Sequence, residues 1–315
     1  MKVADSADRV KAEIGKAFVG QERAVEQVLA AVLADGHVLI EGVPGLGKTL
    51  LVRSLATALD LPFTRIQFTP DLMPTDVIGT EVFDQRDVEF KLRRGPVFTA
   101  ILLADEINRT PPKTQAALLE AMEERHATIG GVRYELPYPF LVFATQNPIE
   151  FEGTYPLPEA QQDRFLLKIL LTYQPPEAEK DVLRRFHFGF RTQRLESAGI
   201  EPVLHAEELR TMRKQVDETT VEDKVFDYVY SIVAATRNHP DLLVGASPRA
   251  GLALVGCSKA VAAMRDRDFV IPDDVKELAL PVLRHRVLLK PEAEIEGLSV
   301  DQVLLGLLES QVVPR

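Results

Sequence analysis

Apolar and polar positions alternate with two different periods along the first half of the chain. Apolar side chains recur every three or four residues over 22–33 and 48–59, which predicts helices. Residues 38–40 form a short apolar run before a glycine-rich segment, 63–68 look extended, and 100–104 and 140–144 are further apolar runs. Buried strands separated by helices are typical of a parallel sheet that helices cover on both faces.

Two stretches interrupt this rhythm and predict hairpins. Residues 81–84 and 88–91 flank a polar turn, and residues 127–129 and 132–134 flank Gly130-Gly131, a pair suited to a two-residue turn with positive φ. Each hairpin either caps the sheet at the surface or is an insertion that contacts a partner or substrate.

The second half of the chain carries almost only helical patterns. Prolines at 175 and 176 end the last strand pattern and stiffen the connection that follows. Beyond them, helical spacing is found over 177–188, 206–215, 222–238, 248–265, 272–283 and 300–311. We therefore expect an α/β domain over 1–175 and an all-helical domain over 176–315.

Composition and charge disfavour several classes of protein. The 315 residues include 47 acidic and 37 basic side chains, a formal charge of −10, which disfavours a nucleic-acid-binding protein. The one cysteine, Cys257, excludes an internal disulfide and lies in an apolar helical pattern, as a small buried hydrophobe would. No segment has the length of a membrane span, and the amino terminus is charged at once. We expect a cytoplasmic protein that does not insert into a membrane.

The glycine-rich segment after the first strand carries the clearest chemistry. Residues 42–49, Gly-Val-Pro-Gly-Leu-Gly-Lys-Thr, match the phosphate-binding loop G-x-x-x-x-G-K-[ST] and lie between a predicted strand and a predicted helix. Glycines let successive backbone N–H groups converge on phosphate oxygens, and the helix amino terminus adds partial positive charge. Lys48 then reaches the β- and γ-phosphates of a nucleotide, and the Thr49 hydroxyl ligates Mg²⁺.

Two further strands end in polar residues. The run 101–104 delivers Asp105 and Glu106, where Asp105 is placed to hold the Mg²⁺ shell and Glu106 to accept a proton from an attacking water. The run 140–144 leads to Asn147, whose amide can orient that water. Ligands bind at the carboxyl ends of strands in open parallel sheets, so we expect Asn147 to lie close to Glu106.

The ordered set of motifs resembles the AAA+ ATPases, and within them the MoxR family. Walker A at 42–49, Walker B at 101–106, sensor 1 at Asn147, Asp163-Arg164-Phe165 and Gly245-Ala246-Ser247-Pro248-Arg249 follow the family order. Residues 105–109, Asp-Glu-Ile-Asn-Arg, and 157–161, Leu-Pro-Glu-Ala-Gln, also resemble MoxR sequences. The resemblance covers nearly the whole chain. It implies an AAA+ α/β core with hairpin insertions and a helical lid.

The resemblance also implies roles for single residues. Arg164 matches an arginine finger that reaches the γ-phosphate bound by a neighbouring subunit, although an ion pair with a nearby carboxylate is an alternative. Arg249 matches sensor 2, and Ser247-Pro248 places it in a first helical turn. The residues expected to contact ATP are Val19, Gly20, Gly42, Val43, Pro44, Gly45, Leu46, Gly47, Lys48, Thr49, Leu50 and Asp105.

The resemblance therefore implies an Mg²⁺-dependent ATPase that works as a homo-oligomeric ring, typically a hexamer. Members of the family remodel or mature client protein complexes in a chaperone-like way, often with a partner that bears a von Willebrand factor A domain. Three alternatives stay open: a motor subunit of the metal-chelatase type, a nucleic-acid translocase, and a nucleotide-gated binding scaffold.

Overall fold

A five-stranded parallel sheet forms the centre of the first half of the chain. A computed structural model describes residues 2–149, 153–191 and 195–314. The strands lie in the order β2 (Phe63–Gln67), β5 (Ile101–Asp105), β8 (Leu141–Gln146), β1 (Val38–Glu41) and β9 (Leu167–Leu170), and each neighbouring pair is parallel. The parallel sheet expected from the apolar runs is confirmed. The last strand before the prolines is β9, which alternates buried and more exposed residues; its bounds were not predicted.

The inner strands are apolar throughout because each of their faces is buried against a separate cluster of side chains. On β5, Ile101 and Leu103 belong to one core cluster, whereas Leu102 and Ala104 belong to the other. Successive side chains of a strand point to opposite faces, so burial on both sides removes the usual apolar–polar alternation.

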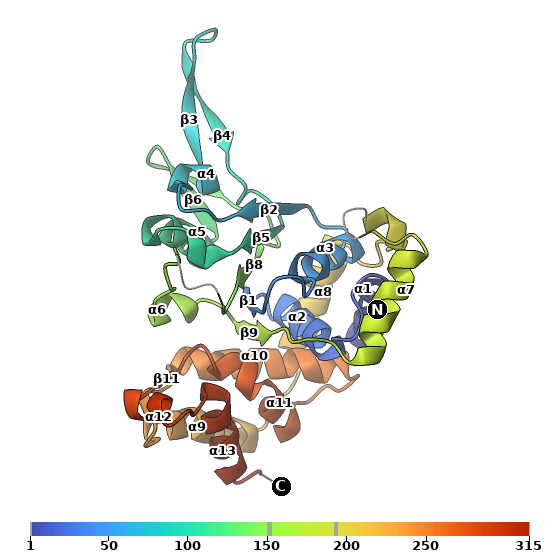
Figure 1. The fold of residues 1–315 in the computed structure, drawn as a ribbon, viewed down its shortest axis with the longest axis vertical. Helices are drawn as coiled ribbons and strands as arrows, with labels where there is room; N and C mark the ends of the chain where they lie inside the picture. Colours follow the sequence, from blue (N-terminus) through green and yellow to red (C-terminus); the bar gives the residue numbers. More distant parts are fainter. Residues whose placement is uncertain (1, 150–152, 192–194, 315) are drawn as a thin grey trace.

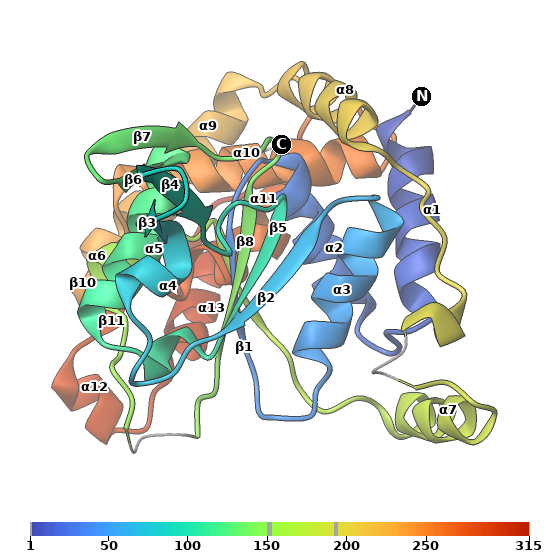
Figure 2. The same ribbon diagram turned by 90° about the horizontal axis from the view of Figure 1, so that it is seen from above.

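Helices cover the two faces of the sheet. In Figures 1 and 2, α1 (Val3–Gly15), α2 (Glu22–Leu33) and α3 (Lys48–Ala58) lie on one side. On the other side lie α4 (Pro74–Ile78), α5 (Pro112–Glu124) and α6 (Glu159–Gln162). The segment after β5 is a short 3₁₀ helix, η1 (Ile107–Arg109). Helices α2 and α3 agree with the sequence prediction, whereas α1 and α5 were not predicted.

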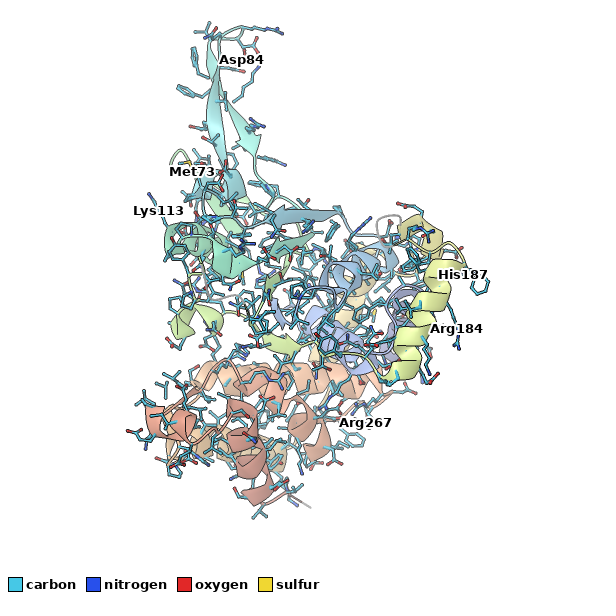
Figure 3. All side chains as sticks on the ribbon, viewed as in Figure 1. Met73, Asp84, Lys113, Arg184, His187 and Arg267 are labelled. Atoms are coloured by element: carbon cyan, nitrogen blue, oxygen red, sulfur yellow. The ribbon has the colours of Figure 1, made fainter. Side chains whose placement is uncertain are left out.

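Both predicted hairpins form. Strands β3 (Gly79–Asp84) and β4 (Glu89–Arg94) pair only with each other and rise from the body of the molecule, with Asp84 at the far end (Figures 1 and 3). Strands β6 (His126–Ile129) and β7 (Val132–Glu135) are joined by Gly130 and Gly131 at φ of 57° and 82°. These positive φ values explain the glycine pair, because other residues rarely adopt them.

The second half is mainly helical, as expected. Its elements are α7 (Pro176–His187), η2 (Leu195–Ala198), α8 (Ala206–Asp217), α9 (Asp223–Arg237), β10 (Leu242–Val244), α10 (Pro248–Met264), α11 (Pro272–Leu283), β11 (Leu288–Leu289), α12 (Pro291–Ile295) and α13 (Val300–Ser310). The short antiparallel pair β10–β11 was not predicted. Helices α9 to α13 gather below the sheet in Figure 1, and within the described residues no helix is long and apolar enough to cross a membrane.

Helices α7 and α8 lie against helices of the first half. The Arg213 side chain of α8 donates from Nε and Nη2 to the Val32 carbonyl at the end of α2, at 3.0 and 2.7 Å. Arg185 of α7 donates from Nη1 to the carbonyl of Gly15, at the end of α1, at 2.9 Å. Helix α7 can be found in Figure 3 by the labels of Arg184 and His187. The domain boundary at 175 stays a prediction.

The single cysteine, Cys257, is part of the core. Cys257 lies on α10 with no exposed surface, and burial raises the pKa of its thiol to about 12. It is therefore the small buried hydrophobe that the sequence indicated.

Candidate functional site

The predicted phosphate loop follows β1 directly and runs into the first two residues of α3, Lys48 and Thr49. Gly45 and Gly47 have φ of 89° and 84°, and Gly47 is the residue that precedes the helix. Only glycine adopts such values readily, so the loop can turn its backbone N–H groups inward. The Lys48 ammonium group donates to the carbonyl oxygens of Gly42 and of Val43, the latter at 3.2 Å.

Asp105 ends β5 and is held by two other side chains. The Thr145 hydroxyl donates to Oδ1 at 2.5 Å, and the Arg65 guanidinium donates from Nη2 to Oδ2 at 2.6 Å. Thr145 is fully buried on β8 and Arg65 lies on β2, so the two neighbours of β5 fix this carboxylate from opposite sides. Asp105 itself is only 8% exposed.

Glu106 has a backbone conformation that is rare for residues other than glycine, with φ of 57°. Its N–H donates to the Thr145 hydroxyl at 2.9 Å. Its carboxylate oxygen Oε2 accepts hydrogen bonds from Gln67 Nε2 at 2.6 Å and from Arg109 Nη1 at 3.1 Å. Strained backbone of this kind persists where surrounding contacts enforce it and is frequent at functional sites.

Asn147 follows β8 and is 4% exposed. Its Oδ1 accepts a hydrogen bond from the Ile149 N–H at 3.3 Å. Its Nδ2, although buried, has no hydrogen-bond partner among the residues that the structure describes. Buried amide donors are nearly always satisfied, so this donor is suited to a ligand or an ordered water.

These elements surround one cavity of about 460 Å³. Its lining consists of Pro44, Gly45, Leu46, Gly47, Lys48, Thr49, Leu50, Arg53, Arg65, Asp105, Glu106 and Asn147. The expected closeness of Glu106 and Asn147 follows from the direct pairing of β5 with β8. Thr49 and Asp105 line the same cavity, and their side chains supply oxygen donors of the kind that Mg²⁺ prefers, so the residues present fit a magnesium ion.

A second cavity, of about 550 Å³, lies near the start of the phosphate loop. It is lined by Gly20, by residues around β9 such as Leu170 and Tyr173, and by Pro281 of α11. The end of β9 is adjacent to the loop, because the Leu171 N–H donates to the Glu41 carbonyl at 2.8 Å. Gly20 lines this cavity and Val19 does not, and the contact of either residue with the base stays a prediction.

Arg164 and Arg249 both pair with Glu123 and do not line the phosphate-loop cavity. Arg164 Nη1 lies 2.5 Å from Glu123 Oε2, and Arg249 Nη2 lies 2.9 Å from Glu123 Oε1. Both arginines line a separate cavity of about 330 Å³ that shares no residue with the lining around Lys48. The Ser247 cap is confirmed, since its hydroxyl accepts from the Arg249 N–H at 3.2 Å.

Sequence reasoning missed several polar residues of these sites. Among them are Arg53, Arg65, Gln67, Thr145 and Glu123. Arg65 and Gln67 are separated by the buried Ile66, and this alternation is the only local signal that they point to one face of an edge strand. Nothing in the local sequence singles out Thr145 or Glu123, because their partners come from distant segments.

The chain is similar to several known proteins. Residues 37–167 match the family model described as ATPase family associated with various cellular activities (AAA), and residues 234–305 match the AAA lid domain. The protein YeaC of Bacillus subtilis is 45% identical over 96% of this chain and 92% of its own length. The chaperone MoxR1 of Mycobacterium tuberculosis is 43% identical, over 98% of this chain and 82% of its own.

One further sequence relative and one solved structure are also similar to the chain. The protein MoxR of Methylorubrum extorquens is 34% identical over 92% of this chain and 90% of its own length. A crystal structure of a candidate ATPase from Cytophaga hutchinsonii superposes with a TM-score of 0.90 at 42% identity, and the match covers 99% of this chain and 96% of that one.

Proposed function

The chain belongs to the MoxR family of AAA+ ATPases, and from this premise we propose that it hydrolyses ATP with Mg²⁺ in a ring of identical subunits to remodel or mature client protein complexes. The observation that carries the proposal is the separation of two sets of residues. Lys48, Glu106 and Asn147 line one cavity, whereas Arg164 and Arg249 line another.

The first cavity supplies the groups that hydrolysis of a phosphoanhydride needs. The loop N–H groups and the Lys48 ammonium bind phosphate oxygens, and Thr49 and Asp105 hold the metal ion. Bound Mg²⁺ neutralises the charge that develops on the phosphates. Glu106 accepts a proton from the water that attacks the γ-phosphorus, while the unpaired Nδ2 of Asn147 orients that water or the γ-phosphate. The products are ADP and inorganic phosphate.

The second cavity supports assembly into a closed ring. Cations are needed at the γ-phosphate during transfer, and Arg164 and Arg249 do not line their own phosphate-loop cavity. A head-to-tail arrangement brings the arginine face of one subunit to the phosphate loop of the next, and such heterologous contacts close into rings. We propose a hexamer, as the family resemblance implies, with both arginines acting on the neighbour's ATP.

A chaperone-like role is supported by the name of the relative MoxR1 and by the long β3–β4 hairpin. The hairpin exposes Phe83, Val88 and Phe90, which are 47%, 74% and 69% exposed. Large exposed apolar side chains on a projecting element favour contact with another protein. We propose that these hairpins face the client, and that a protein with a von Willebrand factor A domain acts with the ring.

Affinity capture with hydrolysis blocked tests this function. Glu106→Gln subunits loaded with ATP and Mg²⁺ should retain client and partner proteins, which mass spectrometry then identifies. Lys48→Ala subunits, which should not hold ATP, serve as the matched control. Specific enrichment of a multi-subunit complex with Glu106→Gln supports remodelling. ATPase stimulation by DNA, or by a metal-chelatase partner, together with no protein enrichment, contradicts it.

A further inference from the structure

The carboxylate of Glu123 is shared by two arginines that are 85 positions apart in the chain. Glu123 is the last residue but one of α5, and this helix lies on the side of the sheet away from α3 (Figure 2). Oε2 pairs with Arg164 from the segment after α6, and Oε1 pairs with Arg249 from the first turn of α10. Both carboxylate oxygens are therefore used, one for each guanidinium.

The backbone around the two arginines is fixed independently of Glu123. The Asp163 carboxylate accepts a hydrogen bond from the Ser247 hydroxyl at 3.1 Å and pairs with Arg286 Nε at 2.6 Å. The Arg286 side chain is 2% exposed and also donates to the Phe165 carbonyl at 2.7 Å. These contacts join residues 163–165 to the start of α10, so a change at Glu123 leaves the two segments side by side.

The guanidinium groups themselves depend on the carboxylate. The side chains of Arg164 and Arg249 are 31% and 47% exposed, and they share Glu123 as their common acidic partner. Arg164 has one more contact, from Nη1 to the Leu119 carbonyl at 2.7 Å. Like charges repel, and long side chains are free to turn toward solvent, so without Glu123 the two cations separate.

We propose that Glu123 is a positioning residue that holds Arg164 and Arg249 as a pair, ready to engage the polyphosphate bound by the neighbouring subunit. This inference rests on the proposed trans arrangement. A carboxylate that binds both guanidiniums sets their separation before the neighbour's ATP arrives. Preorganised donors of this kind act mainly on the transition state, because they are already aimed at the place where charge develops.

Glu123→Gln is the direct test. The amide retains one acceptor oxygen, so it can pair with one arginine, but its NH₂ group faces the donors of the other. We expect kcat for ATP to fall by roughly 10- to 100-fold, the scale of a small misplacement of catalytic groups, while KM changes less than twofold. Glu120→Gln, an exposed carboxylate one turn earlier on α5, is the matched control and should leave kcat unchanged.

A double-mutant cycle with Arg249 separates positioning from a general structural effect. If Glu123 acts by holding Arg249 in place, Arg249→Ala lowers kcat by a much smaller factor in the Glu123→Gln background than in the unaltered protein. If the two losses multiply, Glu123 and Arg249 act independently and the proposal is wrong. Loss of ring assembly in Glu123→Gln, measured by light scattering, also overturns it, because the residue is then an assembly contact.

The outcome also distinguishes this inference from the proposed function. An unaltered protein without ATPase activity, or an Arg164→Ala variant with normal kcat, contradicts the proposed trans mechanism. Normal kcat in Glu123→Gln together with a large loss in Arg164→Ala contradicts only the role of Glu123. Glu123→Asp serves as a second variant: its shorter carboxylate should recover part of the lost kcat, since its charge is retained.

Discussion

The guanidinium of Arg65 donates two hydrogen bonds to one oxygen of the Asp105 carboxylate, from Nη2 at 2.6 Å and from Nε at 3.0 Å to Oδ2. The same guanidinium donates to the Gln67 side chain, which in turn donates to Glu106. One cation therefore links the carboxylate assigned to the metal with the carboxylate assigned to proton transfer, and three of the four residues line the phosphate-loop cavity.

This contact predicts how Arg65 affects metal binding. A positive charge beside Asp105 opposes a second cation, so Arg65→Gln should lower the Mg²⁺ concentration needed for half-maximal ATP binding. The expected change is about fivefold, which corresponds to ~1 kcal/mol for a partly exposed charge pair. The measurement is a Mg²⁺ titration followed with a fluorescent ATP analogue.

Arg86→Gln, at the exposed turn of the β3–β4 hairpin, is the control and should not shift that titration. A rise in the Mg²⁺ requirement of Arg65→Gln would show instead that Arg65 orients Asp105 for the metal.

Lys48 and Glu106 should separate nucleotide binding from hydrolysis. Lys48→Ala removes the cation that faces the β- and γ-phosphates, so ATP binding should weaken strongly and turnover should vanish. Glu106→Gln keeps the shape of the side chain but cannot accept a proton, so ATP should bind while kcat falls by roughly 10²–10⁴. Calorimetric binding and phosphate release measure the two effects. A Glu106→Gln protein that fails to bind ATP is incompatible with the assigned role.

Arg164 should act on the ATP of the neighbouring subunit. Arg164→Ala should bind ATP normally yet hydrolyse it at least 10³-fold more slowly, the lower end of the effect of arginine fingers. Mixed with Lys48→Ala subunits, it should recover part of its activity, because some interfaces then join an intact phosphate loop to an intact arginine. If mixed rings form and no activity returns, Arg164 instead belongs to a structural ion pair with Glu123.

The buried His37 should make stability depend on pH. Its Nδ1 accepts from the Val142 N–H at 3.0 Å, so Nε2 donates to the Met122 carbonyl at 3.1 Å. Burial, aided by the nearby Arg125, lowers the pKa of His37 from 6.5 to about 3. Below pH 6.5 the unfolded chain therefore binds a proton at His37 that the folded protein does not bind. The free energy of unfolding decreases for this reason as the pH falls from about 6.5 toward 3.

The size of this effect can be measured by urea unfolding at pH 6 and pH 5. The amide of His37→Gln can make both hydrogen bonds but does not titrate. Between pH 6 and pH 5, its free energy of unfolding should therefore fall by about 1 kcal/mol less than that of the unaltered protein. His187→Gln, on the exposed face of α7, is the control. Equal pH dependence in His37→Gln and the unaltered protein would rule out His37 as a source of the acid sensitivity.

Local patterns were sufficient for most elements near the site. The runs that became β1, β5 and β8 were recognisable because burial on both faces leaves no polar positions, and the loop at 42–49 because its glycines and Lys48 are contiguous. The bounds of strand β9 were not predicted, because Lys168 interrupts a four-residue apolar segment. This lysine pairs with a distant partner, Glu41 on β1, at 2.8 Å. Helix α5 was not predicted because two of its buried positions, Thr114 and Gln115, carry polar side chains and interrupt the apolar spacing.

The sequence by itself indicated the chemistry of the phosphate site, because Lys48 and Thr49 are adjacent in one loop, and because Asp105 ends one recognisable strand, with Glu106 directly after it and Asn147 directly after another. Only the tertiary structure decided how these groups are held and which groups lie elsewhere. The order of β2, β5 and β8 brings Arg65 and Thr145 to Asp105. The packing of α10 against the segment after α6 brings Arg249 to Glu123 and Arg164. Contacts between segments far apart in the chain depend on strand order and helix packing, and local periodicity carries no information about either.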